Sequence, residues 1–231
     1  MLDSSEVRQG HRIVIQIDEE IGRLINLIYW LRDNSVECHF KINLTFLIAN
    51  SKIMLAHLNG IGVQPIVDVR MYDEPAHIVS ACTELTRLGS IKGFNLHIGN
   101  VESLPMIWAA FKAKHHLFLS DIPASDLDTR HVLELGRKFQ CVALETVAAK
   151  VESLNDKIGE HNEPRILAAG FSLRNGEVHK SGIREAIHKG ADMVLINSQD
   201  LVLSGDPNYL FREIIREIIA GLDGEAMAQG R

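Results

Sequence analysis

The chain has 231 residues, of which 46% are hydrophobic and 23% are charged, and its formal net charge is −6. This composition is typical of a globular protein, and the length fits one large domain. Because the basic residues are scattered rather than clustered, neither a nucleic acid nor an anionic membrane surface is expected as the main partner. A small polar ligand fits the charge pattern better.

The three cysteines, Cys38, Cys82 and Cys141, are an odd number at wide spacing and show no zinc-binding pattern. We expect them to be reduced thiols of a cytoplasmic protein. The first residues lack a basic segment followed by an apolar run, and no apolar stretch reaches the ~20 residues of a membrane span. The sequence therefore predicts a cytoplasmic protein with no membrane partner.

Short apolar runs rich in Val, Ile and Leu recur along the chain, and each is unbroken enough for a strand covered on both faces. They occupy residues 13–17, 38–42, 65–69, 93–97, 116–120, 140–145, 166–169 and 192–196. Segments with helical periodicity lie between and after them, at 19–32, 44–59, 76–88, 103–114, 125–138, 146–158 and 182–189. In the last helix, Asp206 is expected to cap, Pro207 to occupy the first turn, and an apolar stripe to run from Leu210 to Ile219.

A strand followed by a helix, eight times over, is best satisfied by a closed (β/α)8 barrel, the TIM barrel. A doubly wound open sheet is the alternative, but no Gly-rich dinucleotide loop follows the first strand. No linker or change of composition divides the chain, so we expect a single domain over residues 1–231, with loosely ordered ends at about 1–10 and 221–231.

Barrel enzymes place their chemistry at the carboxyl ends of the strands, and polar residues gather at those positions here. They are Asp18, Lys41, Asp68, Arg70, Asp73, His97, Ser120, Asp121 and Ser125. Cations and carboxylates that alternate around one mouth can hold each other in place. Glu145, at the end of the sixth expected strand, is either a substrate contact or a helix-capping residue.

The spacing of Asp18, Lys41, Asp68-x-Arg70-x-x-Asp73-x-Pro75, His97 and Asp206-Pro207 resembles that of orotidine 5′-phosphate decarboxylases over residues 12–220. In that family the third strand carries D-x-K-x-x-D-I-P, and its lysine donates the proton that replaces the departing carboxylate. The resemblance implies a homodimer that needs no metal or organic cofactor. Related barrels that use D-x-K-x-x-D with magnesium fit Lys41 and Pro75 less well.

The resemblance also implies residue roles. Asp68, Arg70, Asp73 and Lys41 would be catalytic: Asp68 would face the substrate carboxylate, and Asp73 would reach into the partner's site. Contacts to a pyrimidine nucleotide, or to a similar phosphorylated ligand, would come from Asp18, Lys41, His77, Ser125, Ser172, Arg174, Asn197 and Ser198.

The departures from the family pattern fall on functional positions. Arg70 replaces the lysine, and a guanidinium is a poorer acid than an ammonium. After the seventh strand the family's P-G-I-R is replaced by Ala-Gly-Phe-Ser, and after the eighth its G-R is replaced by Asn197 and Ser198. A serine offers one hydroxyl where arginine offers a bidentate grip, so phosphate affinity is expected to be lower unless Arg174 or Lys180 compensates.

Three functions remain open from these residues. The first is decarboxylation of orotidine 5′-monophosphate to UMP in pyrimidine biosynthesis, with altered or weakened activity. The second is a catalytically inactive barrel that binds a ligand or regulates another protein. The third is a related lyase that acts on another acid. Fold resemblance alone does not choose among them.

Overall fold

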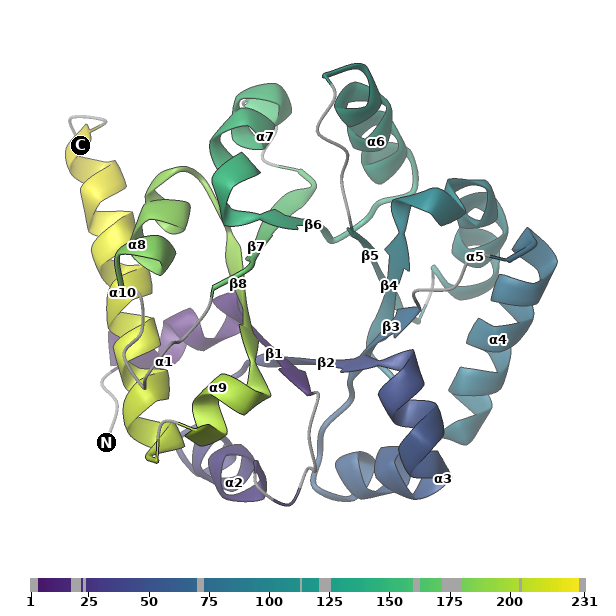
Figure 1. The fold of residues 1–231 in the computed structure, drawn as a ribbon, viewed down its shortest axis with the longest axis horizontal. Helices are drawn as coiled ribbons and strands as arrows, with labels where there is room; N and C mark the ends of the chain where they lie inside the picture. The colour runs from purple at the N-terminus through teal and green to yellow at the C-terminus, as the bar shows by residue number, and fades with distance from the viewer. Residues whose placement is uncertain are drawn as a thin grey trace. The chain divides into compact units, whose positions relative to one another are not determined.

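The computed structural model describes residues 4–17, 22, 24–69, 73–112, 114–120, 126–159, 163–171, 180–203 and 205–228. Eight parallel strands follow one another in chain order around a closed barrel (Figure 1). They are β1 (Ile13–Ile17), β2 (His39–Asn43), β3 (Ile66–Val69), β4 (Gly93–His97), β5 (His116–Ser120), β6 (Ala143–Val147), β7 (Arg165–Ala169) and β8 (Met193–Asn197). The predicted (β/α)8 barrel is confirmed.

The described helices are α1 (Ser4–Gln9), α2 (Ile25–Asp33), α3 (Leu44–Gly60), α4 (Pro75–Leu88), α5 (Leu104–Phe111), α6 (Asp126–Lys138), α7 (Val151–Ile158), α8 (Lys180–His188), α9 (Ser198–Leu203) and α10 (Pro207–Ala228). Single 3-10 segments occupy Gly10–Arg12, Ile98–Ser103 and Ala148–Lys150. None of the helices in the described part of the chain is long and apolar enough to cross a membrane.

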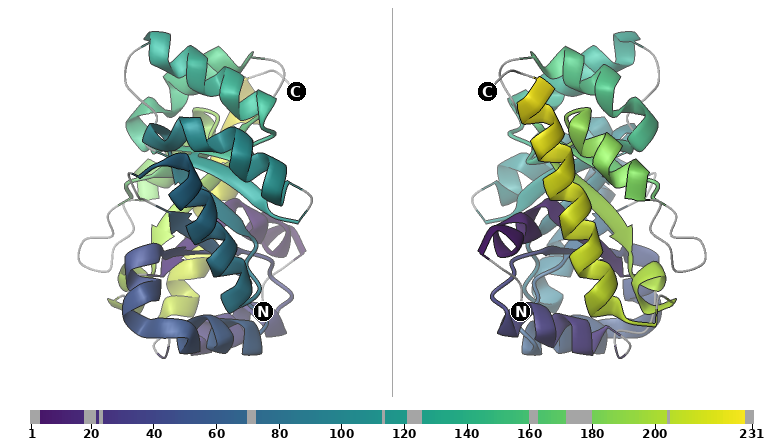
Figure 2. Two further views of the ribbon diagram at one scale, coloured as in Figure 1. Left: turned by 90° about the vertical axis from the view of Figure 1, so that its right-hand side faces the viewer. Right: turned by 90° about the vertical axis from the view of Figure 1, so that its left-hand side faces the viewer.

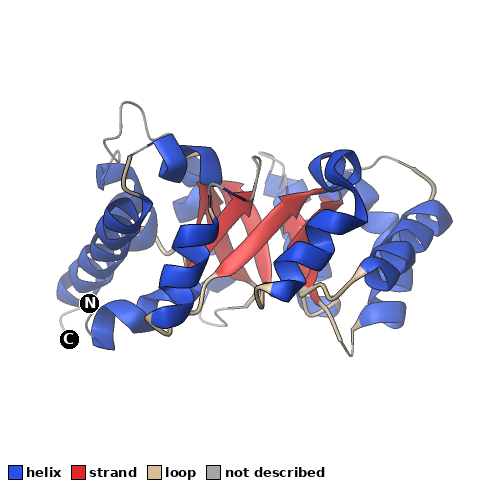
Figure 3. Cartoon of the chain, turned by 90° about the horizontal axis from the view of Figure 1, so that it is seen from below, coloured by secondary structure: helices blue, strands red, loops and turns tan. Residues whose placement is uncertain are grey.

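The chain forms two compact units. The first unit comprises Met1–His39, Val147–Asp156 and Ile166–Arg231, and the second comprises Phe40–Thr146 and Lys157–Arg165. In each unit the strands lie on the inner side of the helices, as the red and blue elements of Figure 3 show. The segments where we expected loosely ordered ends contain helix, because α1 begins at Ser4 and α10 extends to Ala228.

In the first unit, α10 packs against α8 along its apolar stripe (Figure 2, right). Leu210, Phe211, Ile214, Ile215 and Ile218 are all buried. The expected cap is present, because the Asp206 carboxylate accepts a hydrogen bond of 3.0 Å from the Tyr209 amide. The bidentate pair of Arg184 on α8 with Glu217 on α10 fixes how the two helices are aligned.

In the second unit, β4 and β5 approach each other closely at Gly93. A Cβ atom added there would lie 2.1 Å from the carbonyl oxygen of His116, so only glycine fits. The sixth strand begins three residues later than its apolar run predicted. Gln140 takes a positive φ of 49°, and the Cys141 amide bonds back to the Gly136 carbonyl, so residues 140 and 141 complete the end of α6.

The cysteines are free thiols in the structure, as expected for reduced side chains. Cys82 and Cys141 are buried in the second unit, and burial raises the pKa of each thiol to about 12. A thiol with such a pKa is protonated at neutral pH and therefore unreactive.

His115, just before β5, makes the stability of the second unit depend on pH. Its ring packs against Phe94 and Phe111, and its Nδ1 lies 3.1 Å from the Ile91 carbonyl oxygen, which fixes Nδ1 as the donor. Desolvation lowers the pKa of His115 below its usual 6.5. The unfolded chain therefore binds more protons just below pH 6.5, so stability is complete above that pH and declines as the pH falls.

We expect the free energy of unfolding to decrease between pH 7.5 and pH 5.5, and to decrease less in a His115→Phe variant. Urea titrations at both pH values measure this difference. An identical pH dependence in wild type and His115→Phe would contradict the assignment.

Candidate active site

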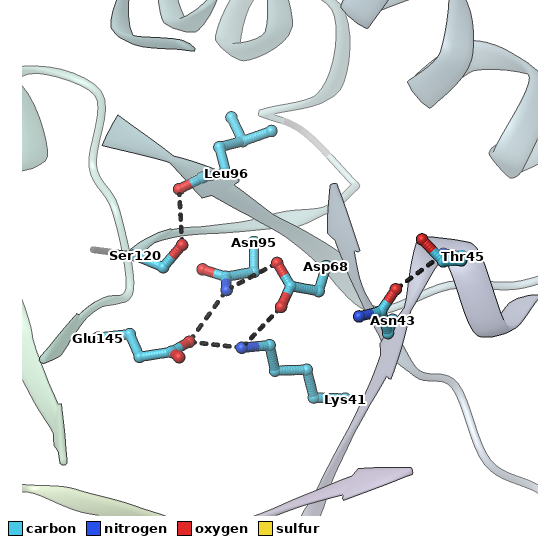
Figure 4. Close-up of polar contacts among 8 residues, drawn as sticks. All are labelled: Lys41, Asn43, Thr45, Asp68, Asn95, Leu96, Ser120 and Glu145. Atoms are coloured by element: carbon cyan, nitrogen blue, oxygen red, sulfur yellow. Dashed lines mark hydrogen bonds and ion pairs between the residues drawn. The ribbon is translucent and has the colours of Figure 1, made fainter. Parts of the chain in front are cut away.

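Four buried polar side chains meet inside the second unit, and we call them the Lys41 cluster. They are Lys41 from β2, Asp68 from β3, Asn95 from β4 and Glu145 from β6 (Figure 4). Lys41, Asp68 and Asn95 are each 1% exposed and Glu145 is 6% exposed. Charged residues are almost never buried to this degree unless they are paired, so the charges of the cluster must pair with one another or with a bound ligand.

Strand register brings the four residues together. Asp68 and Asn95 lie directly opposite each other on neighbouring strands. Lys41 is opposite Ile66, two residues before Asp68 on the same face of β3, and its long stem covers that offset. Glu145 lies within β6. It is therefore a strand residue and not the helix cap that the sequence left as one alternative.

The contacts of the Lys41 cluster form a closed cycle, which Figure 4 draws as dashed lines. Lys41 Nζ lies 3.0 Å from Asp68 Oδ2 and 2.5 Å from Glu145 Oε2. Asn95 Nδ2 donates to Asp68 Oδ1 at 3.2 Å and to Glu145 Oε2 at 3.0 Å. Each carboxylate is thus held by the same ammonium and the same amide.

The described residues of the cluster carry one positive and two negative charges. Lys41 lies between the two carboxylates in a buried place, and its single ammonium contacts both of them. Ion pairs in such a place are strong only when their remaining polar groups are hydrogen-bonded as well, and Asn95 supplies those bonds. The arrangement holds two carboxylates rigidly next to an ammonium, which is suited to controlling charge on a bound molecule.

The Asn95 amide has one unused group. Its Oδ1 is buried and has no hydrogen-bond partner within the described part of the chain. In Figure 4 this oxygen points away from Asp68 and Lys41, on the side where Ser120 is drawn. The Ser120 hydroxyl donates to the Leu96 carbonyl oxygen at 3.4 Å. Most buried polar atoms of native proteins are satisfied, so this exception calls for an explanation.

Two of the expected site residues pair with each other at the protein surface. Asp73 Oδ1, just before α4, accepts a hydrogen bond of 2.7 Å from the Glu74 amide and lies 2.9 Å from Nδ1 of His77. The hydrogen bond with His77, followed by that with the Glu74 amide, lowers the pKa of Asp73 below its usual 3.8. Both side chains are exposed, so Asp73 is available to a partner molecule.

The other expected site residues divide into two groups. Asp18, Arg70, Ser125, Ser172 and Arg174 lie outside the described residues. Asn197 ends β8, where it is exposed, and the buried Ser198 begins α9. Of the predicted catalytic residues, the structure brings Lys41 and Asp68 together.

Sequence reasoning missed Asn95 and did not foresee that Glu145 binds Lys41. A signal for Asn95 was present, because an amide between Phe94 and Leu96 interrupts an apolar strand on the same face as His97. No local signal pairs Glu145 with Lys41, since the two residues are 104 positions apart.

A groove of about 720 Å³ lies at the other end of the strands in the second unit. Gln64, Thr86, Ser90, Lys114 and His115 line part of it, and they belong to segments that precede or lead into β3, β4 and β5. Barrel enzymes bind substrates at the carboxyl ends of their strands, so we do not choose this groove as the active site. Among the described residues, no group of three or more His, Cys, Asp or Glu side chains could hold a metal ion.

Comparison with known proteins supports the fold and gives no match by sequence. No family model matches the chain, and no curated protein sequence matches it. Solved structures do match. Orotidine 5′-monophosphate decarboxylase from Sulfolobus solfataricus has a TM-score of 0.72 and 17% sequence identity, with 91% of this chain and 99% of that chain covered.

Orotidine 5′-phosphate decarboxylase from Pyrococcus horikoshii OT3 has a TM-score of 0.70 at 16% sequence identity, and the match covers 90% of this chain and 99% of that chain. An uncharacterized conserved protein from Geobacillus kaustophilus has a TM-score of 0.67 at 13% identity, with coverages of 89% and 99%. The chain therefore has an orotidine 5′-phosphate decarboxylase-like fold. At these identities the likeness concerns the fold.

Proposed function

We propose that this chain is a carboxy-lyase of the orotidine 5′-phosphate decarboxylase type, which acts on orotidine 5′-monophosphate or a closely similar phosphorylated pyrimidine acid. The single observation that carries the proposal is the buried ion pair of Lys41 and Asp68, at 3.0 Å, inside a barrel with this fold. In such a pair a carboxylate and an ammonium lie within reach of the same bound group.

The proposed reaction uses the two charges at different moments. Asp68 repels the carboxylate of the substrate, and the bond between that carboxylate and the pyrimidine carbon breaks with release of carbon dioxide. The electron pair stays on the ring carbon, where the Lys41 ammonium stabilises the negative charge that develops. A proton then adds to that carbon, either from Arg70 or, where Arg70 acts only as a second stabilising cation, from water.

We propose that no metal or organic cofactor takes part, as the sequence resemblance implies. The phosphate of the ligand would be bound by Ser172, Arg174, Asn197 and Ser198. In the family pattern an arginine follows the seventh strand and another follows the eighth, and each can bind phosphate through two hydrogen bonds. Ser172 and Ser198 replace these arginines here, so we expect weaker phosphate binding than in the decarboxylases that the fold resembles.

The purified protein, mixed with orotidine 5′-monophosphate, tests the proposal. We expect the ultraviolet absorbance of the substrate to decline as the protein turns it over. An Arg70→Lys variant, which restores a better acid, should raise the rate. If micromolar protein leaves the absorbance unchanged in both forms, the chain is not this decarboxylase.

A specific observation favours a second function, ligand binding without turnover. Glu145 lies 2.5 Å from Lys41 Nζ, so the ammonium already faces two carboxylates before any substrate arrives. Less of its charge is then left to stabilise a carbanion. Calorimetric binding of uridine 5′-monophosphate without loss of absorbance from orotidine 5′-monophosphate would select this second function.

We also propose that two copies of the chain associate through α3. Ile48 and Ile53 on this helix are 70% and 77% exposed, which is unusual for isoleucine. In the second unit α3 contacts α4, which begins beside the exposed Asp73 and His77 (Figure 2, left). A partner that covers α3 would therefore lie near Asp73 as well.

Placing a charge on α3 should dissociate the dimer. For an Ile48→Lys, Ile53→Lys double variant we expect a shift from dimer to monomer in sedimentation velocity, because a buried unpaired charge opposes association. Met106→Lys, at an exposed position on α5, is the matched control and should stay dimeric. A wild-type chain that sediments as a monomer at all concentrations would exclude the proposed dimer.

A further inference from the structure

Oδ1 of Asn95 is a buried acceptor without a hydrogen-bond partner among the described residues. The proposed reaction assigns it no role. Its side chain belongs to the Lys41 cluster and is 1% exposed, so bulk solvent does not satisfy it. Buried acceptors that stay unsatisfied are costly, and in a candidate site they indicate a group supplied by a ligand.

The direction of this acceptor is fixed by the rest of the amide. Asn95 Nδ2 donates one hydrogen bond to Asp68 and one to Glu145, so both of its N–H groups are used. Turning the amide over would aim its oxygen at two carboxylates, which accept and do not donate. The orientation is therefore determined, and Oδ1 is held ready for a donor that comes from outside the cluster.

The surroundings restrict which donor fits. An anionic group placed against Oδ1 would lie beside two carboxylates and would bring no proton to donate. A neutral N–H or O–H group carries no negative charge to be repelled and has a proton to donate to Oδ1. Lys41 adds a complementary feature, because its ammonium has three N–H groups and the contacts with Asp68 and Glu145 account for two of them.

We propose that Asn95 is a specificity-determining residue that contacts the ligand, and that its Oδ1 accepts a hydrogen bond from a neutral donor of a pyrimidine nucleotide. The donor is the ring N–H or a sugar hydroxyl, and the chemistry of the contact is the same for both. This inference rests on the proposed function, because it takes the ligand of the Lys41 cluster to be such a nucleotide.

A site built around a hydrogen-bonded donor rejects ligands that lack it, because the buried acceptor is then left unpaired. Calorimetry on the full chain compares uridine 5′-monophosphate with its 3-methyl, 2′-deoxy and 3′-deoxy derivatives, each of which lacks one donor. We expect one derivative to bind the wild type at least about tenfold more weakly than the parent nucleotide. The derivative that binds more weakly identifies the donor to Asn95 as the ring N–H, the 2′-hydroxyl or the 3′-hydroxyl.

An Asn95→Ala variant completes a cycle between the residue and the ligand group. In this variant the dissociation constants of the parent nucleotide and of the weakly bound derivative should lie within about twofold of each other, because the acceptor that distinguished the two ligands has been removed. Asn59→Ala is the matched control. Asn59 bonds to Val63 and Ser90, outside the cluster, so its loss should leave the discrimination unchanged. If Asn95→Ala does not fold, Asn95→Ser replaces it in the cycle.

The outcomes separate this inference from the proposed function. If the wild type binds all four nucleotides equally, or discriminates among them as strongly without Asn95, the assignment of Asn95 is wrong while nucleotide binding stands. If the wild type binds none of them at millimolar concentration, the proposed function fails and this inference fails with it. Discrimination that depends on Asn95 supports the inference even if orotidine 5′-monophosphate is never decarboxylated.

Discussion

A Lys41→Met variant is expected to unfold with a free energy about 3–5 kcal/mol lower than that of the wild type. Methionine fills nearly the same volume, so the loss comes from charge rather than from a cavity. Without the ammonium, Asp68 and Glu145 lose the cation that both of them contact, and their two carboxylates lie on either side of the Asn95 amide. Urea titration followed by circular dichroism measures the change.

Lys189 provides the control for this prediction. Its Nζ also contacts two carboxylates, Glu185 at 2.7 Å and Glu152 at 3.5 Å, but at the protein surface. Because exposed ion pairs contribute little, we expect Lys189→Met to destabilise the protein much less than Lys41→Met does. Adding Glu145→Gln to Lys41→Met should restore part of the lost stability, since it removes the repulsion between two buried carboxylates. Equal losses in the two lysine variants would show that burial of Lys41 has no energetic consequence.

An Asp68→Asn variant is expected to keep its fold and lose its activity. The substitution preserves size, and Lys41 still pairs with Glu145, so we expect the free energy of unfolding to decrease by about 1.5–3 kcal/mol, less than in Lys41→Met. Turnover of orotidine 5′-monophosphate should decrease by about 10²–10³-fold, because the negative charge that faces the substrate carboxylate is removed. Initial rates at saturating substrate measure the effect on kcat.

Glu217→Gln is the matched control for Asp68→Asn. Glu217 is likewise a buried carboxylate paired with a cation, at 3.0 Å from Arg184, but it belongs to the packing of α8 against α10. We expect this variant to lose stability and keep the kcat of its folded fraction. An Asp68→Asn protein that turns over substrate at the wild-type rate would falsify the role proposed for Asp68.

The sequence predicted the architecture because the relevant signals are local. Each strand lies in a short, mostly apolar run, and β1, β4 and β5 were located to the residue. The start of α10 was predicted from Asp206 and Pro207, whose capping chemistry acts within one turn. The six-residue helices α1 and α9 were missed, since a segment of that length contains too few turns to show a helical period.

The predicted site was recovered only in part, again for a physical reason. Lys41 and Asp68 were identified because a charged residue inside an apolar run is conspicuous in the sequence. Asp73 was expected to reach into the partner's site, and within this chain it pairs with His77 at i,i+4 spacing where α4 begins, so the site roles of both residues stay predictions. Asp18, Arg70, Ser125, Ser172 and Arg174 remain predictions, because they lie outside the described residues.

By itself, then, the sequence predicted eight strand and helix units, their closure into a barrel, and a lysine and an aspartate that gather at one mouth of it. Only the tertiary structure decided which groups satisfy them. Glu145 and Asn95 enter the cluster from β6 and β4 because parallel strands are brought into register by pairing between distant segments. Hydrophobic periodicity acts over a few residues, whereas a buried charge is stabilised by whichever partner the closed barrel places beside it.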